Sequence, residues 1–340
     1  MNETGEIMLK TTPELEFAIR AVRQASLLVK QVQAEMVSSA LTKDDRSPVT
    51  VADFAAQALV GYLLDEAFPN DAMIGEEDSS VLQTPEESET LARITYFVGQ
   101  YASGATPETV CQWIDRGAAQ SANRYWTLDP IDGTKGFLRG DQYAVALALV
   151  VHGDVKIGVL GCPNLTDGYQ PEIGGSGSLV IAARGEGTWV TAIDGFVEGE
   201  AGFQRVSVSG LTDPAGARLL RSFESGHTNV SQIDIFADNL GVQAEPVRMD
   251  SQAKYAVLAA GHGELYLRLL SLSHPDYREK IWDQAAGSIV IEEAGGTVTD
   301  LDGKPLDFTQ GRTLAKNRGI CGSNGVLHKA ALKALEEIGA

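Results

Sequence analysis

The sequence predicts a protein of mixed α+β and α/β class, in which an α+β first half is followed by an α/β second half. Two helical patterns come first, and a series of short β-type runs follows them up to about residue 208. From residue 209 onward, strand-like and helix-like segments alternate. The 340 residues, 44% of them hydrophobic and 21% charged, can form a packed core and two domains, expected at 1–208 and 209–340.

Two long helices are expected before any sheet. Thr12 and Pro13 mark the start of the first helix, and its buried stripe recurs at spacings of three and four residues. The residues of this stripe are Leu15, Ala18, Val22, Ala25, Val29, Val32 and Met36. Thr50 is the expected N-cap of the second helix, which residues 68–70 end.

The segment 79–124 is interpreted as an insertion, with helical patterns at 91–101 and 108–116. Short β-type runs follow it, and we expect them to form a mainly antiparallel meander. These runs are residues 125–128, 143–151, 155–160, 179–183, 188–190 and 205–208. The Gly-rich segment 164–178 between them is expected to be a surface loop.

The second half alternates between the two kinds of element, which is typical of an α/β domain. Its expected strands are residues 218–223, 246–249 and 264–269. Its expected helices are residues 230–240, 252–260 and 281–294.

The net charge of the chain restricts its partners. With 46 acidic and 27 basic residues the formal charge is −19, which disfavours binding to nucleic acid or to an anionic membrane. An anionic ligand would therefore need local neutralisation by a metal ion or by a small group of Lys and Arg side chains.

The compartment is predicted from the cysteines and the N-terminus. Cys111, Cys162 and Cys321 form no CxxC pair, which favours a reducing compartment. The sequence has no signal-peptide pattern and no apolar run long enough to span a bilayer. We therefore expect a cytoplasmic protein, with a monomer as the default.

Three acidic clusters stand out: GEED at 75–78, DPIDGT at 129–134 and WD at 282–283. A β-type run leads directly into the second cluster, so its two aspartates are expected at a sheet edge. Carboxylates gathered without His or Cys form an all-oxygen site, which selects Mg²⁺, and two such ions can clamp a phosphoryl group. Gly133 and Thr134 would add backbone amides at a helix start that can hold an anion.

Each cluster also has a structural interpretation. The Asp-Pro and Asp-Gly pairs at 129–133 are typical of a turn, and GEED is typical of a solvated turn. Asp283 could be an acidic residue at a helix start, and Asp53 could be the capping partner of Thr50. From composition and spacing alone, these alternatives stay open.

GEED, DPIDGT and WDQAAG at 282–287, in this order along the chain, resemble the motifs of the Mg²⁺-dependent, lithium-sensitive inositol monophosphatase superfamily. Within it, the chain resembles the 3′(2′),5′-bisphosphate nucleotidases, both in its long insertion and in four segments. These segments are residues 47–60, 129–150, 250–255 with its SQAK motif, and 277–290. The resemblance extends from about residue 15 to residue 324.

This resemblance implies a layered αβαβα sandwich and a reaction. The expected substrate is adenosine 3′,5′-bisphosphate, with its 5′-phosphosulfate as a further candidate, losing the 3′-phosphate to give AMP or adenylyl sulfate. Two or three Mg²⁺ ions per site and inhibition by Li⁺ are also implied. The alternatives are a phosphatase of the same superfamily that acts on inositol or sugar phosphates, and a non-catalytic nucleotide sensor.

The resemblance also implies roles for individual residues. The implied metal ligands are Glu76, Asp129, the carbonyl of Ile131, Asp132 and Asp283. Asp53 and Thr134 would activate the attacking water, a role in which Glu76 could share. The implied substrate contacts are Gly133, Thr134, His227, Ser251, Lys254, Arg268 and Asp283. Ser251 could instead only cap a helix, His227 could be an ordinary imidazole, and Arg278 and Lys280 are expected to be solvated.

Overall fold

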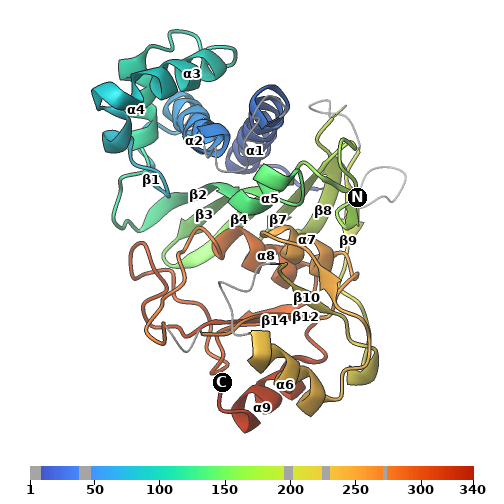
Figure 1. Ribbon diagram of the computed structural model, residues 1–340. Helices are drawn as coiled ribbons and strands as arrows, with labels where there is room; N and C mark the ends of the chain where they lie inside the picture. Colours follow the sequence, from blue (N-terminus) through green and yellow to red (C-terminus); the bar gives the residue numbers. More distant parts are fainter. Residues whose placement is uncertain (1–8, 38–46, 195–201, 224–229, 271–273) are drawn as a thin grey trace.

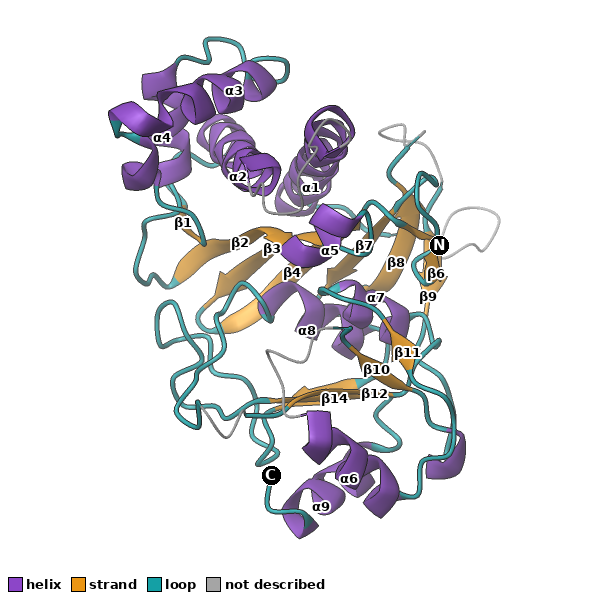
Figure 2. Cartoon of the chain, in the orientation of Figure 1, coloured by secondary structure: helices purple, strands orange, loops and turns teal. Residues whose placement is uncertain are grey.

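The computed structural model describes residues 9–37, 47–194, 202–223, 230–270 and 274–340. Helices α1 (Pro13–Val32) and α2 (Ser47–Ala67) cover the outer face of a large mixed sheet (Figure 1). Helices α7 (Ala253–Ala259) and α8 (Ala285–Glu293) separate it from a second sheet, and α6 (Val230–Leu240) and α9 (His328–Glu337) lie beyond that sheet (Figure 2). The predicted αβαβα sandwich is confirmed.

Helix α1 begins as predicted, because the Thr12 Oγ1 accepts a hydrogen bond from the Leu15 N–H at 3.3 Å. A π-helical turn, Gln33–Val37, continues it. The prediction for the second helix is wrong at its start, because α2 begins at Ser47 and Thr50 is already helical. Pro48 stands near the first position of α2, where a missing N–H costs nothing.

The large sheet has the strand order β1-β2-β3-β4-β7-β8-β9, with only the β1–β2 pair parallel. Its strands are β1 (Ala72–Gly75), β2 (Arg124–Asp132), β3 (Ala144–Val151), β4 (Asp154–Cys162), β7 (Ser178–Ala183), β8 (Gly187–Ala192) and β9 (Gln204–Val206). The antiparallel meander is therefore confirmed, but β1 was not predicted. The expected loop 164–178 holds the short hairpin β5 (Leu165–Thr166) and β6 (Gln170–Pro171).

The insertion forms helices α3 (Ser88–Val98) and α4 (Pro107–Asp115), preceded by the 3₁₀ turns Ser79–Leu82 and Pro85–Glu87. Both helices pack against α2 at the edge of the molecule next to β1. The two helical patterns that the sequence showed in this segment are confirmed.

The second sheet has the order β11-β10-β12-β14-β13, with parallel pairs among its first three strands and antiparallel pairs among the rest. Its strands are β10 (Leu219–Arg221), β11 (Val247–Arg248), β12 (Leu265–Arg268), β13 (Thr297–Thr299) and β14 (Ile320–Ser323). The last two strands and α9 were not predicted. The core between the sheets takes apolar side chains from both sides of residue 208, and the division into two domains stays a prediction.

None of the helices in the described ranges combines the length and the apolar character that crossing a bilayer takes.

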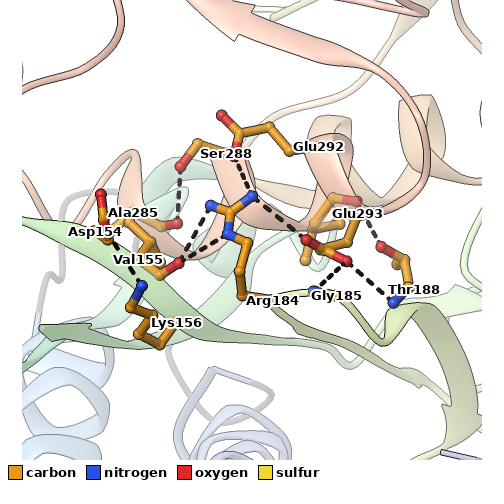
Figure 3. Close-up of polar contacts among 12 residues, drawn as sticks. Asp154, Val155, Lys156, Arg184, Gly185, Thr188, Ala285, Ser288, Glu292 and Glu293 are labelled. Carbon is orange, nitrogen blue, oxygen red and sulfur yellow. Dashed lines mark hydrogen bonds and ion pairs between the residues drawn. The ribbon is translucent and has the colours of Figure 1, made fainter.

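The C-terminal end of α8 is fastened to the large sheet by a polar network around the turn between β7 and β8 (Figure 3). One oxygen of Glu293 accepts hydrogen bonds from the backbone N–H groups of Gly185 and Gly187, at 2.9 and 3.1 Å. Arg184 donates to the Val155 carbonyl at 3.2 Å and pairs with Glu292 at 2.8 Å. This network fixes the helix that directly follows Asp283.

Glu293→Ala is expected to lower the free energy of unfolding by about 1–3 kcal/mol, because two backbone donors lose a charged acceptor. Glu292→Ala is the matched control from the same helix. Its side chain is 34% exposed against 11% for Glu293, and its contact is one ion pair, so a loss below about 1 kcal/mol is expected. Chemical denaturation of both variants measures this difference, and equal losses would contradict the account.

Candidate active site

Strand β2 carries Asp129 and Asp132 at its carboxyl-terminal end. The prediction that the strand stops at residue 128 is wrong, because β2 continues to Asp132 with a shift of register against β3 between the two aspartates. Since β2 has neighbours on both sides, the aspartates end an interior strand and not an edge strand. Asp129 is 2% exposed, and within the described contacts its Oδ1 atom has no hydrogen-bond partner.

The parallel pairing of β1 with β2 brings the first two acidic clusters together. Gly75 is the register partner of Leu128, so Glu76 and Asp129 follow directly at the same end of neighbouring strands. Gln57 of α2 holds the chain here, since it donates to the Glu77 carbonyl at 2.7 Å and accepts from the Glu77 N–H at 3.0 Å. Glu76 itself is exposed at the rim.

Asp53 lies one helical turn before Gln57 on α2, so it points to the same strand ends. It is 7% exposed, and burial, followed by the charges of Glu77 and Glu76, raises its pKa well above the ordinary value. Because the helix starts at Ser47, Asp53 is not the partner of an N-cap at Thr50, and that interpretation is wrong.

The third acidic cluster reaches the site from the α8 side. Asp283 lies just before the N-cap of α8, Gln284, and its Oδ2 is 3.7 Å from an Nη of Arg268 on β12. Arg268 also pairs with the buried Glu279, at 2.8 Å. The charge of Arg268 is thus shared between two acidic residues of the protein.

Loss of solvent and mutual repulsion both raise the pKa values of the carboxyl groups in the cluster. The pKa of Asp129 is raised well above its ordinary value by burial and then by Glu76, Asp132, Asp283 and Asp53. Burial, with further repulsion from Asp132, Glu279 and Glu76 and opposed by Arg268, also raises the pKa of Asp283. Partial desolvation among the crowded side chains and the charge of Asp132 raise the pKa of Glu76, although the residue is exposed, and Lys280 and Arg312 oppose this rise.

A cation would relieve this repulsion, and the donors are all oxygen, which is the ligand set that Mg²⁺ prefers. The Oδ1 atom of Asp129, which has no hydrogen-bond partner within the described contacts, is an oxygen within the carboxylate cluster that can bind a metal ion. In the described parts of the chain, no three or more His, Cys, Asp or Glu side chains are arranged to hold an ion. The residues fit a divalent cation by the chemistry of their oxygen ligands and by their charge.

Gly133 and Thr134 form the turn from β2 into the short helix α5 (Thr134–Arg139). Gly133 has φ 90°, which a glycine adopts without strain, and a Cβ there would lie 2.8 Å from the Cβ of Ser251. Thr134 is exposed and is the first residue of the helix, as predicted.

The SQAK segment touches the acidic cluster directly. The Gln252 N–H donates to Asp132 Oδ2 at 2.6 Å. The prediction that Ser251 is the N-cap of the helix is wrong, because Gln252 occupies that position. Ser251 instead has φ 66°, and its Oγ accepts from the Ala253 N–H at 3.1 Å.

Lys254, the lysine of the SQAK motif, is buried. Its Nζ donates to Ser222 Oγ at 3.0 Å and to the Met249 carbonyl at 3.4 Å, and it lies 5.5 Å from the centre of the Tyr266 ring. Burial lowers its pKa to about 8. His227, the remaining predicted substrate contact, lies outside the described residues.

A sequence model of the inositol monophosphatase family matches residues 10–340. The chain belongs to the inositol monophosphatase family. Within the family it is similar to proteins named 3′(2′),5′-bisphosphate nucleotidase. It is 43% identical over 343 residues to one from Oryza sativa, covering 95% of this chain and 94% of the relative. A second, from Schizosaccharomyces pombe, is 41% identical over 335 residues, covering 93% of each.

Solved structures support the fold of this family member. The inositol monophosphatase from Anabaena superposes with a TM-score of 0.62 at 21% identity and 95% coverage of both chains. The Staphylococcal IMPase-II superposes with a TM-score of 0.63 at 17% identity, covering 96% of this chain and 94% of that one. These structures support the fold, and the relatives at 41–43% identity show that the chain is a phosphatase.

Some residues of this phosphatase site were missed at the sequence level. One is Glu77, whose pKa burial and then the charge of Glu76 raise to about 7. Another is Arg312, which donates a hydrogen bond to the carbonyl of Gly75 in the GEED turn. Lys280, expected to be solvated, instead lowers the pKa of Glu76 and lies 5.7 Å from the centre of the Trp282 ring. No local motif surrounds Arg312, so only the fold shows where it lies.

Proposed function

We propose that this phosphatase removes the 3′-phosphate of adenosine 3′,5′-bisphosphate to give AMP and phosphate, with the 5′-phosphosulfate as a second substrate. The observation that carries the proposal is the carboxylate cluster at the ends of β1 and β2, with the SQAK segment bonded to it through Asp132. The nucleotidases from rice and fission yeast, at 41–43% identity, support the choice of substrate.

Mg²⁺ is the proposed cofactor, with two or three ions per site. Glu76, Asp129, the carbonyl of Ile131, Asp132 and Asp283 would hold it. When bound, the metal would polarise the phosphoryl oxygens and lower the pKa of a water molecule. Li⁺ is expected to inhibit by competing for the same oxygen ligands.

The protein's own residues would handle the attacking water. The Thr134 hydroxyl, exposed at the start of α5, would orient the water by accepting or donating a hydrogen bond. Asp53, whose raised pKa makes it a better proton acceptor than an ordinary aspartate, would take up the proton. The backbone amides after Gly133 would hold the phosphoryl oxygens.

Lys254 is proposed to bind the nucleotide's 5′-phosphate, together with Ser251, and Arg268 and His227 to contact the rest of the substrate. Within the described residues, Lys254 uses two of its three N–H donors, so the third can bind an anion. The ions of the cluster and this ammonium would offset the strongly negative charge of the chain, −19, where the substrate binds.

The pH dependence of substrate binding tests Lys254. Since its pKa is about 8, the KM for the bisphosphate is expected to rise by up to about fivefold between pH 8 and pH 9 as the ammonium deprotonates. Between pH 8 and its ordinary pKa of 10.5 the folded protein binds fewer protons than the unfolded chain, so stability rises with pH there.

Lys254→Arg should remove this rise of KM, because a guanidinium stays charged over the whole range. Lys156→Arg is the matched control, since Lys156 is a surface residue paired with Asp154 at 3.2 Å. Steady-state kinetics of the three proteins at several pH values measure the effect. A KM rise that persists in the Lys254→Arg variant would exclude Lys254 as its source.

Phosphate release tests the function itself. Purified protein is assayed with adenosine 3′,5′-bisphosphate and with inositol 1-phosphate, each with Mg²⁺, with EDTA and with added Li⁺. Release from the nucleotide that needs Mg²⁺ and falls with Li⁺ is expected. Preference for the inositol phosphate would favour the alternative phosphatase activity, and nucleotide binding without release would favour the sensor.

A further inference from the structure

Arg312 lies in the loop between β13 and β14, far in sequence from every acidic motif. Its Nη1 donates to the Gly117 carbonyl at 3.1 Å and its Nη2 to the Gly75 carbonyl at 2.5 Å. Gly75 is the last residue of β1, and the next residue is Glu76. The guanidinium thus holds the backbone from which the Glu76 side chain extends.

The same guanidinium contacts the segment that carries Asp283. Its carbon lies 4.8 Å from the centre of the Trp282 ring, which is within the range of a cation–π contact. The Arg312 carbonyl accepts from the Ile281 N–H at 3.2 Å, and the Leu314 N–H donates to the Glu279 carbonyl at 2.9 Å. The loop is therefore paired along the backbone with the residues just before Asp283.

Arg312 is thus the common contact of two segments that the sequence separates by some two hundred residues. A planar guanidinium can bond two carbonyls with one edge and stack on an aromatic ring with its face, which a lysine ammonium cannot do. Asp78 and Glu76 act on this cation electrostatically, so its charge also faces the acidic cluster.

We infer that Arg312 is a positioning residue that sets the spacing between the Glu76 and Asp283 side chains for the metal ions. This inference rests on the proposed metal-dependent function. In this proposed role, Arg312 contacts neither the substrate nor the metal. It acts through the backbone of Gly75 and the ring of Trp282. Residues that orient metal ligands from outside typically contribute 10–100-fold to metal affinity or activity.

Arg312→Gln is expected to weaken Mg²⁺ binding about tenfold or more, measured by titration calorimetry without substrate and as the Mg²⁺ concentration for half-maximal activity. The KM for the bisphosphate at saturating Mg²⁺ should stay unchanged. Arg312→Lys should restore Mg²⁺ affinity only in part, because it can keep one carbonyl contact and loses the planar stack.

Arg116→Gln is the matched control. Arg116 also bridges two backbone carbonyls, those of Pro69 at 3.2 Å and Asp71 at 3.0 Å, but at the opposite end of β1. The Arg116→Gln substitution should leave the affinity for Mg²⁺ unchanged. If Arg312→Gln does not fold, the Arg312→Lys variant and its calorimetric titration still decide the question.

The outcomes separate the two proposals. Wild-type Mg²⁺ affinity in both Arg312 variants, even with a lower melting temperature, would show a purely structural role and overturn this inference alone. Equal loss of affinity in Arg116→Gln would overturn it as well. A wild-type protein that neither binds Mg²⁺ nor releases phosphate from the bisphosphate would overturn the proposed function, and the inference with it.

Discussion

Asp53→Asn should lower kcat for phosphate release by about 10²–10⁴-fold, the range that a general base contributes. Mg²⁺ affinity and the KM for the nucleotide should change little, because Asp53 is not among the proposed ligands or substrate contacts. The side chain is 7% exposed, and this burial, followed by the charges of Glu77 and Glu76, makes its carboxylate a stronger proton acceptor than an ordinary aspartate. The uncharged amide fills the same volume but cannot accept the proton.

Stability separates this effect from a folding defect. Burial, Glu77 and Glu76 raise the pKa of Asp53 well above 3.8. In the pH window between 3.8 and this raised pKa, the native state therefore binds more protons than the unfolded chain. The Asp53 contribution therefore destabilises the metal-free protein as pH rises through the window, and Asp53→Asn should remove it. Asp65→Asn is the matched control on the same helix, where Asp65 pairs with Arg116 at the surface. An equal loss of kcat in Asp53→Asn and Asp65→Asn would contradict the role of Asp53. An unchanged kcat in Asp53→Asn would contradict it as well.

Asp129→Asn is expected to abolish Mg²⁺-dependent activity, with a loss of at least about 10³-fold, since metal ions supply several kcal/mol of transition-state stabilisation. Asp129 lies at the centre of the repulsion, with an unpartnered oxygen and a pKa raised by burial and by four neighbouring carboxylates. Removing its charge also weakens the repulsion. The metal-free variant should therefore melt at or above the temperature of the metal-free wild type.

Thermal melting with and without Mg²⁺ measures this second effect. Mg²⁺ should raise the melting temperature of the wild type, because a ligand that binds only the native state stabilises it, and should raise that of Asp129→Asn much less. Asp154→Asn, at the exposed start of β4, is the control and should behave like the wild type. An Asp129→Asn variant with the full Mg²⁺ shift would contradict a central ligand role.

The sequence predicts most of this architecture because its signals are local. The apolar stripe of α1, the runs of the meander and the order of the acidic motifs each depend on a few neighbouring residues. The start of α2 was misjudged because Thr50 is a good capping residue in sequence, while Ser47 and Pro48 provide an earlier start. Strand β1 was missed because it is short and its partner β2 is distant in sequence.

The candidate site was only partly predictable for the same reason. The motifs name Glu76, Asp129 and Asp132, and the structure brings Glu76 close to Asp129 because the two follow register partners, Gly75 and Leu128, on parallel strands. Their roles as metal ligands stay a prediction. Gln57 and Arg312 hold backbone groups of other segments, and such contacts depend on tertiary packing that leaves no spacing pattern. The charge sharing of Arg268 between Glu279 and Asp283 likewise becomes visible only when β12 and the segment 279–283 are brought together.

The position of the bond that is cleaved tests the central claim most directly. Adenosine 3′,5′-bisphosphate is incubated with the protein and Mg²⁺, and the nucleotide product is separated by chromatography against 5′-AMP and 3′-AMP standards. The account predicts 5′-AMP and phosphate in equal amounts, and no product when EDTA replaces Mg²⁺. Formation of 3′-AMP, or release that continues in EDTA, would contradict it.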